Sequence, residues 1–274
     1  MKIGYVCTSY NNSHFTVDAA RSLVANTGHE VAVVVVDNAS SQAERRVLAD
    51  LERELPQVSV IFSEDNLGYF RGLNLGMARL RRDQPEVEWM VVGNNDLEFP
   101  ADFGDKLAAN VDRWREYPVV SPDVLTVDGQ HQNPHVISGI SKAREIFYDL
   151  YYSNYQLGRL IHAAAHRFRG LTDRKDEESW HTAQPIYQGH GSVYLIGPRF
   201  FELFAEFWAP TFMMSEEYFL SKQLSDAGHR VYYDPAVQII HHWHASLTNL
   251  PSKRRWELAR DAHREYRKYV KIWD

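Results

Sequence analysis

A short acidic segment, Asn94-Asn95-Asp96, directly follows the apolar run at residues 89–92 and is the first candidate for chemistry. A buried strand that ends in a carboxylate holds that group in a fixed direction. Carboxylate oxygens are hard ligands of the kind that Mg²⁺ and Mn²⁺ prefer. An Asn-Asn-Asp turn after a strand is also ordinary loop chemistry. Asp96 is therefore a candidate metal ligand, and its meaning depends on the groups that the fold brings beside it.

Two further polar turns follow apolar runs, at residues 8–12 after 3–7 and at 37–40 after 31–36. Residues 31–36 are almost unbroken valine, which is typical of a central parallel strand covered on both faces. Ligands of parallel α/β sheets bind at the carboxyl ends of the strands. Three polar turns at that edge predict a crevice large enough for a nucleotide.

The segment from Asn66 to Gly76 is rich in glycine, and Gly72 and Gly76 lie on one face of a predicted helix. Each glycine costs about 1 kcal/mol in a helix interior. The pair therefore indicates either close packing on the sheet or contact with a ligand. The segment is not a Walker loop, because no Gly-Lys-Ser/Thr follows it. It also falls after the third predicted strand, where a Rossmann fingerprint does not belong.

Glu216 and Glu217 stand at the start of a predicted helix, with Ser215 as its expected N-cap. Acids at this position complement the helix dipole, and they are also candidates for a general base. The histidines at 241, 242 and 244 are poor candidates for structural zinc. No cysteine lies near them, and no second group of ligands is spaced for a tetrahedral site.

The composition is that of a globular protein with a substantial core: 274 residues, of which 44% are hydrophobic. A formal net charge of −6 argues against general nucleic-acid binding. The single cysteine, Cys7, excludes an internal disulfide and fits a reducing compartment. No segment reads as a signal peptide or approaches the ~20 apolar residues of a transmembrane helix. We therefore expect a cytoplasmic protein.

The first hundred residues alternate between strand and helix patterns, which implies a parallel sheet with helices on its faces. The second half is less regular, and we expect a single domain. The strands predicted by the pattern are 3–7, 31–36, 58–62, 89–92, one within 119–127, one with a turn at 186–196, 231–233 and 237–240. The predicted helices are 16–25, 43–55, 69–82, 142–169, 216–227 and a basic helix from 252 onward.

Taken in order, these segments resemble the GT-A fold glycosyltransferases, in particular the inverting family 2. The resemblance implies an α/β fold with a mainly parallel central sheet and flanking helices. It implies a nucleotide-sugar-binding half at 1–98, an acceptor-binding half at 99–250 and a C-terminal basic amphipathic helix at 251–274. The matching residues are Thr8-Ser9-Tyr10-Asn11, Asp37-Asn38-Ala39-Ser40, Asn66-Leu67-Gly68, Gly72, Asn74, Gly76, Asn94-Asn95-Asp96, His190-Gly191-Ser192, Glu216-Glu217 and the segment 241–246.

The resemblance implies a donor site at the sheet edge. Asp37 is expected to accept a hydrogen bond from the imide N–H of uracil or thymine, since a carboxylate accepts but does not donate. This favours UDP- or dTDP-sugars over GDP-sugars. Asn94 replaces the first carboxylate of the family's usual DxD pattern. The residues implied to bind the donor are Thr8, Tyr10, Asn11, Asp37, Asn38, Ser40, Asn66, Gly68, Gly72, Asn74, Asn94, Asn95 and Asp96.

The same resemblance implies an inverting transfer to a hydroxyl of a glycan or lipid-linked glycan, in surface polysaccharide biosynthesis. Glu217 is expected to act as general base, with Glu216 as second choice. A Mg²⁺ or Mn²⁺ ion is expected at Asp96, with His241, or alternatively His242, reaching the metal or the diphosphate. The residues implied to line the acceptor site are His190, Gly191 and Ser192.

The C-terminal helix has an aromatic face and a basic excess, so it either packs on the body of the protein or docks on anionic lipid at the inner face of the membrane. Its aromatic face comprises Trp256, Ala259, His263, Tyr266, Val270 and Trp273. Two other functions stay open. One is a non-catalytic carbohydrate- or nucleotide-binding protein that kept the fold, as Asn94 suggests. The other is a sugar-nucleotide pyrophosphorylase, although residues 8–12 lack the glycine and basic residues expected of its N-terminal loop.

Overall fold

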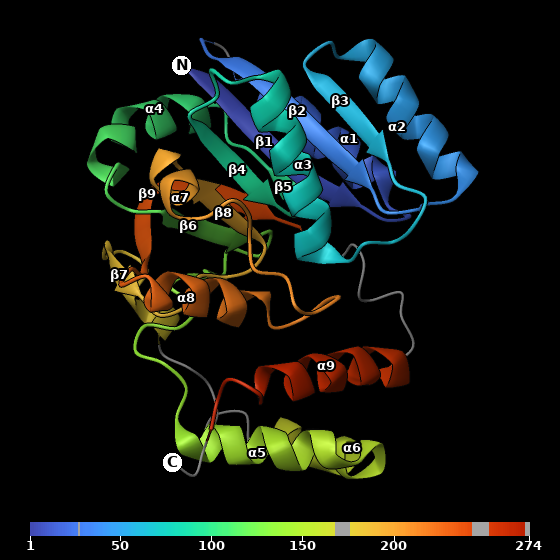
Figure 1. Cartoon of the computed structure of the whole chain (residues 1–274), viewed down its shortest axis with the longest axis vertical. Helices are drawn as coiled ribbons and strands as arrows, with labels where there is room; N and C mark the ends of the chain where they lie inside the picture. The colour runs from blue at the N-terminus through green and yellow to red at the C-terminus, as the bar shows by residue number, and fades with distance from the viewer. Residues whose placement is uncertain (27, 168–175, 243–251, 272–274) are drawn as a thin grey trace.

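The computed structural model describes residues 1–26, 28–167, 176–242 and 252–271 (Figure 1). Its centre is a nine-stranded sheet in the order β3-β2-β1-β4-β8-β6-β9-β5, with β7 paired to β9. The strands are β1 (Lys2–Ser9), β2 (Glu30–Asp37), β3 (Val58–Phe62), β4 (Trp89–Gly93), β5 (Leu97–Glu98), β6 (Val119–Thr126), β7 (Gln184–Ile186), β8 (Val193–Ile196) and β9 (Val231–His241). The helices are α1 (Ser13–Val24), α2 (Gln42–Glu54), α3 (Tyr69–Asp83), α4 (Phe103–Trp114), α5 (Lys142–Ser153), α6 (Tyr155–Arg167), α7 (Pro198–Leu203), α8 (Glu216–Asp226) and α9 (Ser252–Tyr266).

Strands β3, β2, β1 and β4 are all parallel, as the alternating pattern predicts. Their register brings the carboxyl ends of three strands level, because Ser9 pairs with Asp37 and Cys7 pairs with Gly93. The three polar turns that follow β1, β2 and β4 therefore lie side by side. The predicted convergence of the three turns is confirmed, and the crevice itself stays a prediction.

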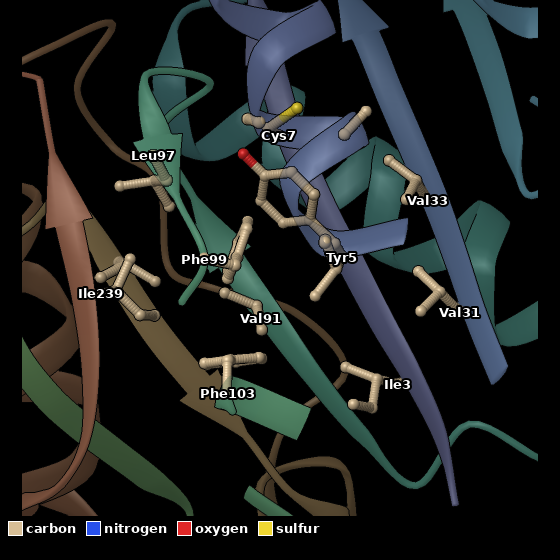
Figure 2. Packing of buried hydrophobic residues seen from close by; sticks show 14 of the residues in the cluster. Ile3, Tyr5, Cys7, Val31, Val33, Val91, Leu97, Phe99, Phe103 and Ile239 are labelled. Carbon is tan, nitrogen blue, oxygen red and sulfur yellow. The ribbon is translucent and has the colours of Figure 1, made fainter. Parts of the chain in front are cut away.

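Both faces of β2 are buried, which explains its valine-rich sequence. Val33 and Val35 join a core cluster with α1, α2 and α4, and Figure 2 shows part of that cluster, including Val33. Ala32 and Val34 join a second cluster on the opposite face, with α3, α7 and α8. A strand covered on both faces needs apolar side chains at every position, so its sequence does not alternate.

Helix α3 lies very close to the sheet, and its glycines allow this. A Cβ atom added at Gly76 would lie 2.4 Å from Val6 Cγ1, and one at Gly72 would lie 2.7 Å from Thr8 Cγ2. Gly76 therefore serves helix-on-sheet packing. Gly72 lies nearer the sheet edge, where its added Cβ would also meet the amide of Asn38 at 3.3 Å.

The pattern did not predict β5, α4 or α7. The second half differs from it in three further places. Residues 231–241 form one continuous strand, β9, rather than two short ones, and its register against β6 shifts between Pro122 and Asp123. The predicted helix at 142–169 is divided into α5 and α6 at Asn154, which has extended backbone and accepts a hydrogen bond from Gln156 N at 2.8 Å. Ser215 precedes α8, but its side chain makes no cap hydrogen bond.

Helix α9 lies against α5 and α8, and the three helices α5, α6 and α9 form a helical lobe beside the sheet (Figure 1). Trp256 and Tyr266 are buried, and His263 Nε2 lies 2.8 Å from Asp149 Oδ1 of α5. Much of the aromatic face of α9 is therefore packed on the protein, as one of the two predicted alternatives requires; Trp273 lies outside the described residues. No helix in the described ranges is long and apolar enough to cross a bilayer.

Candidate active site

The turns after β1, β2 and β4 hold one another through side-chain amides and hydroxyls. Asn11 N donates to Ser40 Oγ at 2.9 Å, and Ser41 N donates to Asn11 Oδ1 at 2.9 Å. Asn95 Nδ2 donates to Asn12 Oδ1 at 2.9 Å, which ties the β4 turn to the β1 turn. Asn95 is thus engaged within the protein, and its place in the site is to position the residue that follows it.

Two neighbouring residues at the end of β2 have different roles in this structure. Asp37 is fully buried, and its carboxylate accepts a hydrogen bond from Arg45 Nε at 2.8 Å and from Ser40 N at 3.3 Å. Asn38 Nδ2 donates to Gly68 O at 3.0 Å, while Asn38 Oδ1 is buried and has no hydrogen-bond partner among the described residues. Asn38 therefore holds an unused acceptor at the sheet edge, and the predicted contact of Asp37 with a base stays a prediction.

Asp96 and His241 meet where β4 and β9 end. The two side chains are almost completely buried, and His241 Nε2 lies 3.3 Å from Asp96 Oδ1. His241 Nδ1 lies 2.7 Å from Gln132 Oε1, and Asn94 Nδ2 lies 3.1 Å from His241 Nε2. Burial raises the pKa of Asp96, but the His241 ring and the Asn94 amide outweigh it, so this pKa lies below its usual value.

This geometry fits a divalent cation. Gln132 Oε1 can only accept, so His241 Nδ1 donates to it, and Nε2 is the ring nitrogen that faces Asp96. Asp96 Oδ1 is buried without a well-aligned hydrogen bond. Two acceptors 3.3 Å apart in a buried site need a cation or a proton near them. No third His, Cys, Asp or Glu joins them within the described ranges, so a bound ligand or water must complete the shell.

The two acids at the start of α8 lie in different surroundings. Glu216 is buried, with Oε1 unpartnered among the described residues, and burial followed by the charge of Glu217 raises its pKa to about 8. Glu217 is partly exposed and lines a cavity of about 270 Å³. Met214 and Ser215 before them both have positive φ, at 77° and 65°. Such backbone is uncommon for residues other than glycine, and it occurs often at functional sites.

Residues 190–192 lie between two pairs of site residues, Asp96 with His241 and Glu216 with Glu217. Asn94 N donates to Ser192 O at 2.7 Å, and Tyr69 Oη donates to Gly191 O at 2.8 Å. A Cβ atom on Gly191 would lie 2.4 Å from Glu217 Oε1, so Glu217 lies directly against this glycine. His190 Nδ1 lies 2.8 Å from Ser192 Oγ. Burial, with smaller effects of His135 and His241, holds the pKa of His190 well below its usual value. His190 is therefore neutral.

Other residues predicted to bind the sugar donor are either exposed or make hydrogen bonds within the protein. Tyr10 is 42% exposed. Asn74 donates to Phe207 O at 2.8 Å and accepts from Phe207 N at 2.9 Å, so its amide holds the loop before α8. Asn66 Oδ1 accepts from Gly68 N at 3.0 Å. His242 faces Glu98 at 2.9 Å, whereas His241 is the histidine beside Asp96.

Sequence patterns did not identify several residues of this site. Gln132 orients His241, and Asn133 Oδ1 accepts from His190 N at 2.8 Å. His135, Arg144 and other residues of 135–152 line the cavity at Glu217. The polar stretch from 128 to 135 has neither helical nor strand periodicity, and only its tertiary contacts reveal its role.

Comparison with known proteins shows which family the chain resembles. The model of Glycosyl transferase family 2 matches residues 6–179. The N-acetylglucosaminyl-diphospho-decaprenol L-rhamnosyltransferase of Mycobacterium tuberculosis is 24% identical over 235 residues, which are 81% of this chain and 69% of that protein.

Two solved structures share the fold. The mannosyltransferase PcManGT from Pyrobaculum calidifontis, in complex with GDP-Man and Mn²⁺, has a TM-score of 0.55 and 15% identity, with 98% of this chain and 64% of that chain covered. TarS 1-349 of S. aureus, in complex with UDP-GlcNAc, has a TM-score of 0.52 and 14% identity, with 92% and 62% covered. The chain thus spans less than two thirds of either solved chain. Because the family model matches more than half of it, the chain belongs to glycosyltransferase family 2 and has the GT-A fold.

Proposed function

We propose that the chain is an inverting glycosyltransferase that uses a UDP- or dTDP-sugar. The observation that carries this proposal is the placement of Asp96 and His241 on one side of segment 190–192 and of Glu217 on the other. A donor diphosphate at the first pair would bring its anomeric carbon toward the cavity at Glu217. The two solved structures with a similar fold contain nucleotide sugars: TarS 1-349 holds UDP-GlcNAc, and PcManGT holds GDP-Man with Mn²⁺. Both complexes support a nucleotide-sugar site in this chain.

Glu217 is the general base in this proposal, because it lines the cavity while Glu216 is buried beside it. Its carboxylate removes the proton of an acceptor hydroxyl, and the oxygen attacks the anomeric carbon. The bond between that carbon and the diphosphate breaks, and the nucleoside diphosphate leaves. Attack from the opposite face inverts the configuration. A Mg²⁺ or Mn²⁺ ion at Asp96 and His241 would offset the charge that develops on the leaving group.

Base recognition is proposed at the end of β2. Asn38 Oδ1 is the buried acceptor without a partner in the described chain, so it suits the imide N–H of uracil or thymine. Asp37 holds the turn through Ser40 and Arg45, and its carboxylate remains a predicted second acceptor. The acceptor is proposed to be a glycan or lipid-linked glycan of surface polysaccharide biosynthesis, as the named substrate of the M. tuberculosis relative suggests.

We also propose that the helical lobe contacts an anionic membrane surface, through α5 rather than through the aromatic face of α9. The polarity of α5 is inverted: Glu145 is 3% exposed, whereas Ile146, Phe147 and Leu150 are 44%, 42% and 51% exposed. The described lobe, residues 142–163 and 252–271, carries eleven Lys and Arg against five Asp and Glu, although the chain as a whole has a net charge of −6. Apolar residues inside a basic surface suit anionic lipid.

The metal assignment predicts a change in nucleotide-dependent stability. At 100 times Kd, UDP or dTDP with Mn²⁺ should raise the Tm of the wild-type chain by roughly 5–10 °C. Asp96→Asn should lose most of that rise, because a neutral amide is a poor metal ligand. Asp102→Asn, which removes an exposed carboxylate, is the matched control. A full Mn²⁺-dependent rise in Asp96→Asn would rule out Asp96 as the ligand. The absence of any rise with UDP, dTDP, GDP or CDP in wild type would favour a non-catalytic protein.

The base assignment predicts that Glu217→Gln loses turnover but keeps donor binding. General base catalysis contributes roughly 10²–10⁴-fold, so kcat for transfer should fall by about that factor. Calorimetric titration of the nucleotide with Mn²⁺ checks that the donor site is intact, and Glu116→Gln is an exposed control. Wild-type turnover in Glu217→Gln would show that another group takes the proton.

The raised pKa of Glu216 predicts a pH effect on stability. Between pH 4.5 and about 8 the folded state holds a proton that the unfolded state has lost, so wild-type stability falls as pH rises through this window. Glu216→Gln has no such proton. It should therefore gain stability relative to wild type between pH 5 and pH 9, on the order of 1–3 kcal/mol. Urea unfolding at both pH values measures this, with Glu116→Gln as control. Parallel pH profiles for wild type and Glu216→Gln would contradict the assignment.

The lipid contact predicts sedimentation of the chain with phosphatidylglycerol vesicles but not with phosphatidylcholine vesicles. Phe147→Glu/Leu150→Glu should weaken this binding at least about tenfold, since burying either side chain is worth about 1.5–3 kcal/mol. Val127→Glu, at a residue 67% exposed outside the lobe, is the control. Retained binding in the double variant would refute the contact, as would a wild-type dimer in light scattering that the double variant lacks.

A further inference from the structure

Two adjoining cavities lead from Glu217 into the helical lobe. The inner one, of about 270 Å³, is lined by Glu217 together with residues of α5 and α9. The outer one, of about 560 Å³, lies among α5, α6 and α9. Both are lined by Tyr152, Met214 and Ala259, so they adjoin each other, and together they make a path that runs from the acid toward the outside of the lobe.

The path is lined by aromatic side chains. Tyr148 lines the inner cavity, and Tyr151, Tyr155 and Trp256 line the outer one, with Tyr152 at their junction. Each of these rings has a flat apolar body and a polar tip. A saccharide presents C–H faces and hydroxyl groups, so a path of this kind suits a sugar that reaches Glu217 with one hydroxyl.

Three arginines line the same path, and within the described ranges none of them pairs with a carboxylate. Arg144 Nε donates to Tyr148 Oη at 3.1 Å, and Arg159 Nη1 lies 3.5 Å from Gln156 Oε1. Arg255 makes no hydrogen bond or ion pair with any residue in the described ranges. The other arginines of α9 and its C-terminal turn do pair with acids. Those neighbours are Arg254, Arg260, Arg264 and Arg267.

The charges along the path are separated by position. Among the residues that the structure describes, Glu217 is the only acid that lines either cavity, and it lies at the inner end. Arg159 and Arg255 line the outer cavity, whose described wall contains no acidic residue. A guanidinium group binds phosphate oxygens through two parallel hydrogen bonds, and it is the side chain best suited to that task. Two arginines without a carboxylate partner in a partly enclosed site therefore indicate an anionic ligand.

We infer that this path is the acceptor site and that it selects a saccharide bearing a phosphate or diphosphate, with the anionic group at Arg159 and Arg255 and the accepting hydroxyl at Glu217. This inference rests on the proposed function and adds the chemical class of its acceptor. Arg144, nearer to Glu217, contacts the sugar between these two ends. The phosphate has two possible sources, a lipid diphosphate and a soluble sugar phosphate.

Calorimetric titration of the full chain tests the inference, with the donor site first saturated by UDP and Mn²⁺. The probes are two matched pairs: geranyl diphosphate against geraniol, and N-acetylglucosamine 1-phosphate against N-acetylglucosamine. Wild type should bind at least one phosphate-bearing probe about tenfold or more tightly than its neutral partner. Arg159→Gln/Arg255→Gln should abolish that preference without lowering Tm. Arg46→Gln/Arg230→Gln removes the same charge from two exposed sites elsewhere and should keep the preference.

Each outcome decides between named alternatives. A preference for geranyl diphosphate identifies a lipid-linked acceptor, and a preference for the sugar phosphate identifies a soluble one. Equal affinity for charged and neutral probes in wild type overturns the inference. So does a preference that survives in Arg159→Gln/Arg255→Gln, or one that is lost equally in Arg46→Gln/Arg230→Gln. Hydrolysis of the donor with Mn²⁺ is measured on the same samples. If hydrolysis is present while the phosphate preference is absent, the inference fails and the proposed function stands.

Discussion

The burial of the Asp96 carboxylate is the constraint on which the rest of the site depends. An ion is costly to bury unless it is paired, and Asp96 is 3% exposed with His241 as its neighbour. That neighbour comes from the end of β9, which is separated from β4 in the sheet by β8 and β6. The chain reaches it because β5, directly after Asp96, pairs antiparallel with the end of β9, with Leu97 opposite His241.

Three buried side-chain oxygens of the site residues lack a partner. Asp96 Oδ1, Asn38 Oδ1 and Glu216 Oε1 are all buried without hydrogen-bond partners among the described residues. Buried polar atoms are almost always satisfied in native proteins, so unsatisfied ones need an explanation. A ligand that brings a cation and an N–H donor would satisfy Asp96 and Asn38, and it would accept a hydrogen bond from Glu216, whose raised pKa keeps it protonated at neutral pH. A nucleotide sugar with a divalent metal is such a ligand.

The helical lobe inverts the usual arrangement of polar and apolar residues, and this links the site to its surroundings. Glu145 and Asp149 of α5 bind Tyr266, His263 and Arg267 on the inner side. The inner surface of the lobe is consequently polar and aromatic, while large aliphatic side chains lie outside. The orientation of α5 therefore has two consequences. The cavity wall beside Glu217 is polar and aromatic, and the outer surface of the lobe is apolar and basic.

Local sequence determined much of the first half of this protein. The valine run of β2, the polar turns and the glycines of α3 each leave a pattern in their own short segment, so the parallel sheet and the convergence of its turns were predictable. The family resemblance named Glu217, Asp96 and His241, and the tertiary structure brings Asp96 and His241 into contact. The sequence could not show whether Asp37 or Asn38 keeps a free acceptor, since both residues are polar. The structure shows that Arg45 of α2 already binds the Asp37 carboxylate, whereas Asn38 Oδ1 has no partner among the described residues.

Tertiary structure alone decided the roles of the second half. Residues 128–135 carry no clear periodicity, yet Gln132 orients His241. The helical pattern at Arg144 was visible, but not that this side chain lines the cavity at Glu217. The aromatic face of α9 was visible in the sequence, but the partner that covers it was not. Burial of α9 against α5 turned the apolar residues of α5 outward. Periodicity records which face of a helix is apolar, whereas the choice of what that face contacts depends on segments far away in the chain, and the sequence of one helix does not contain that information.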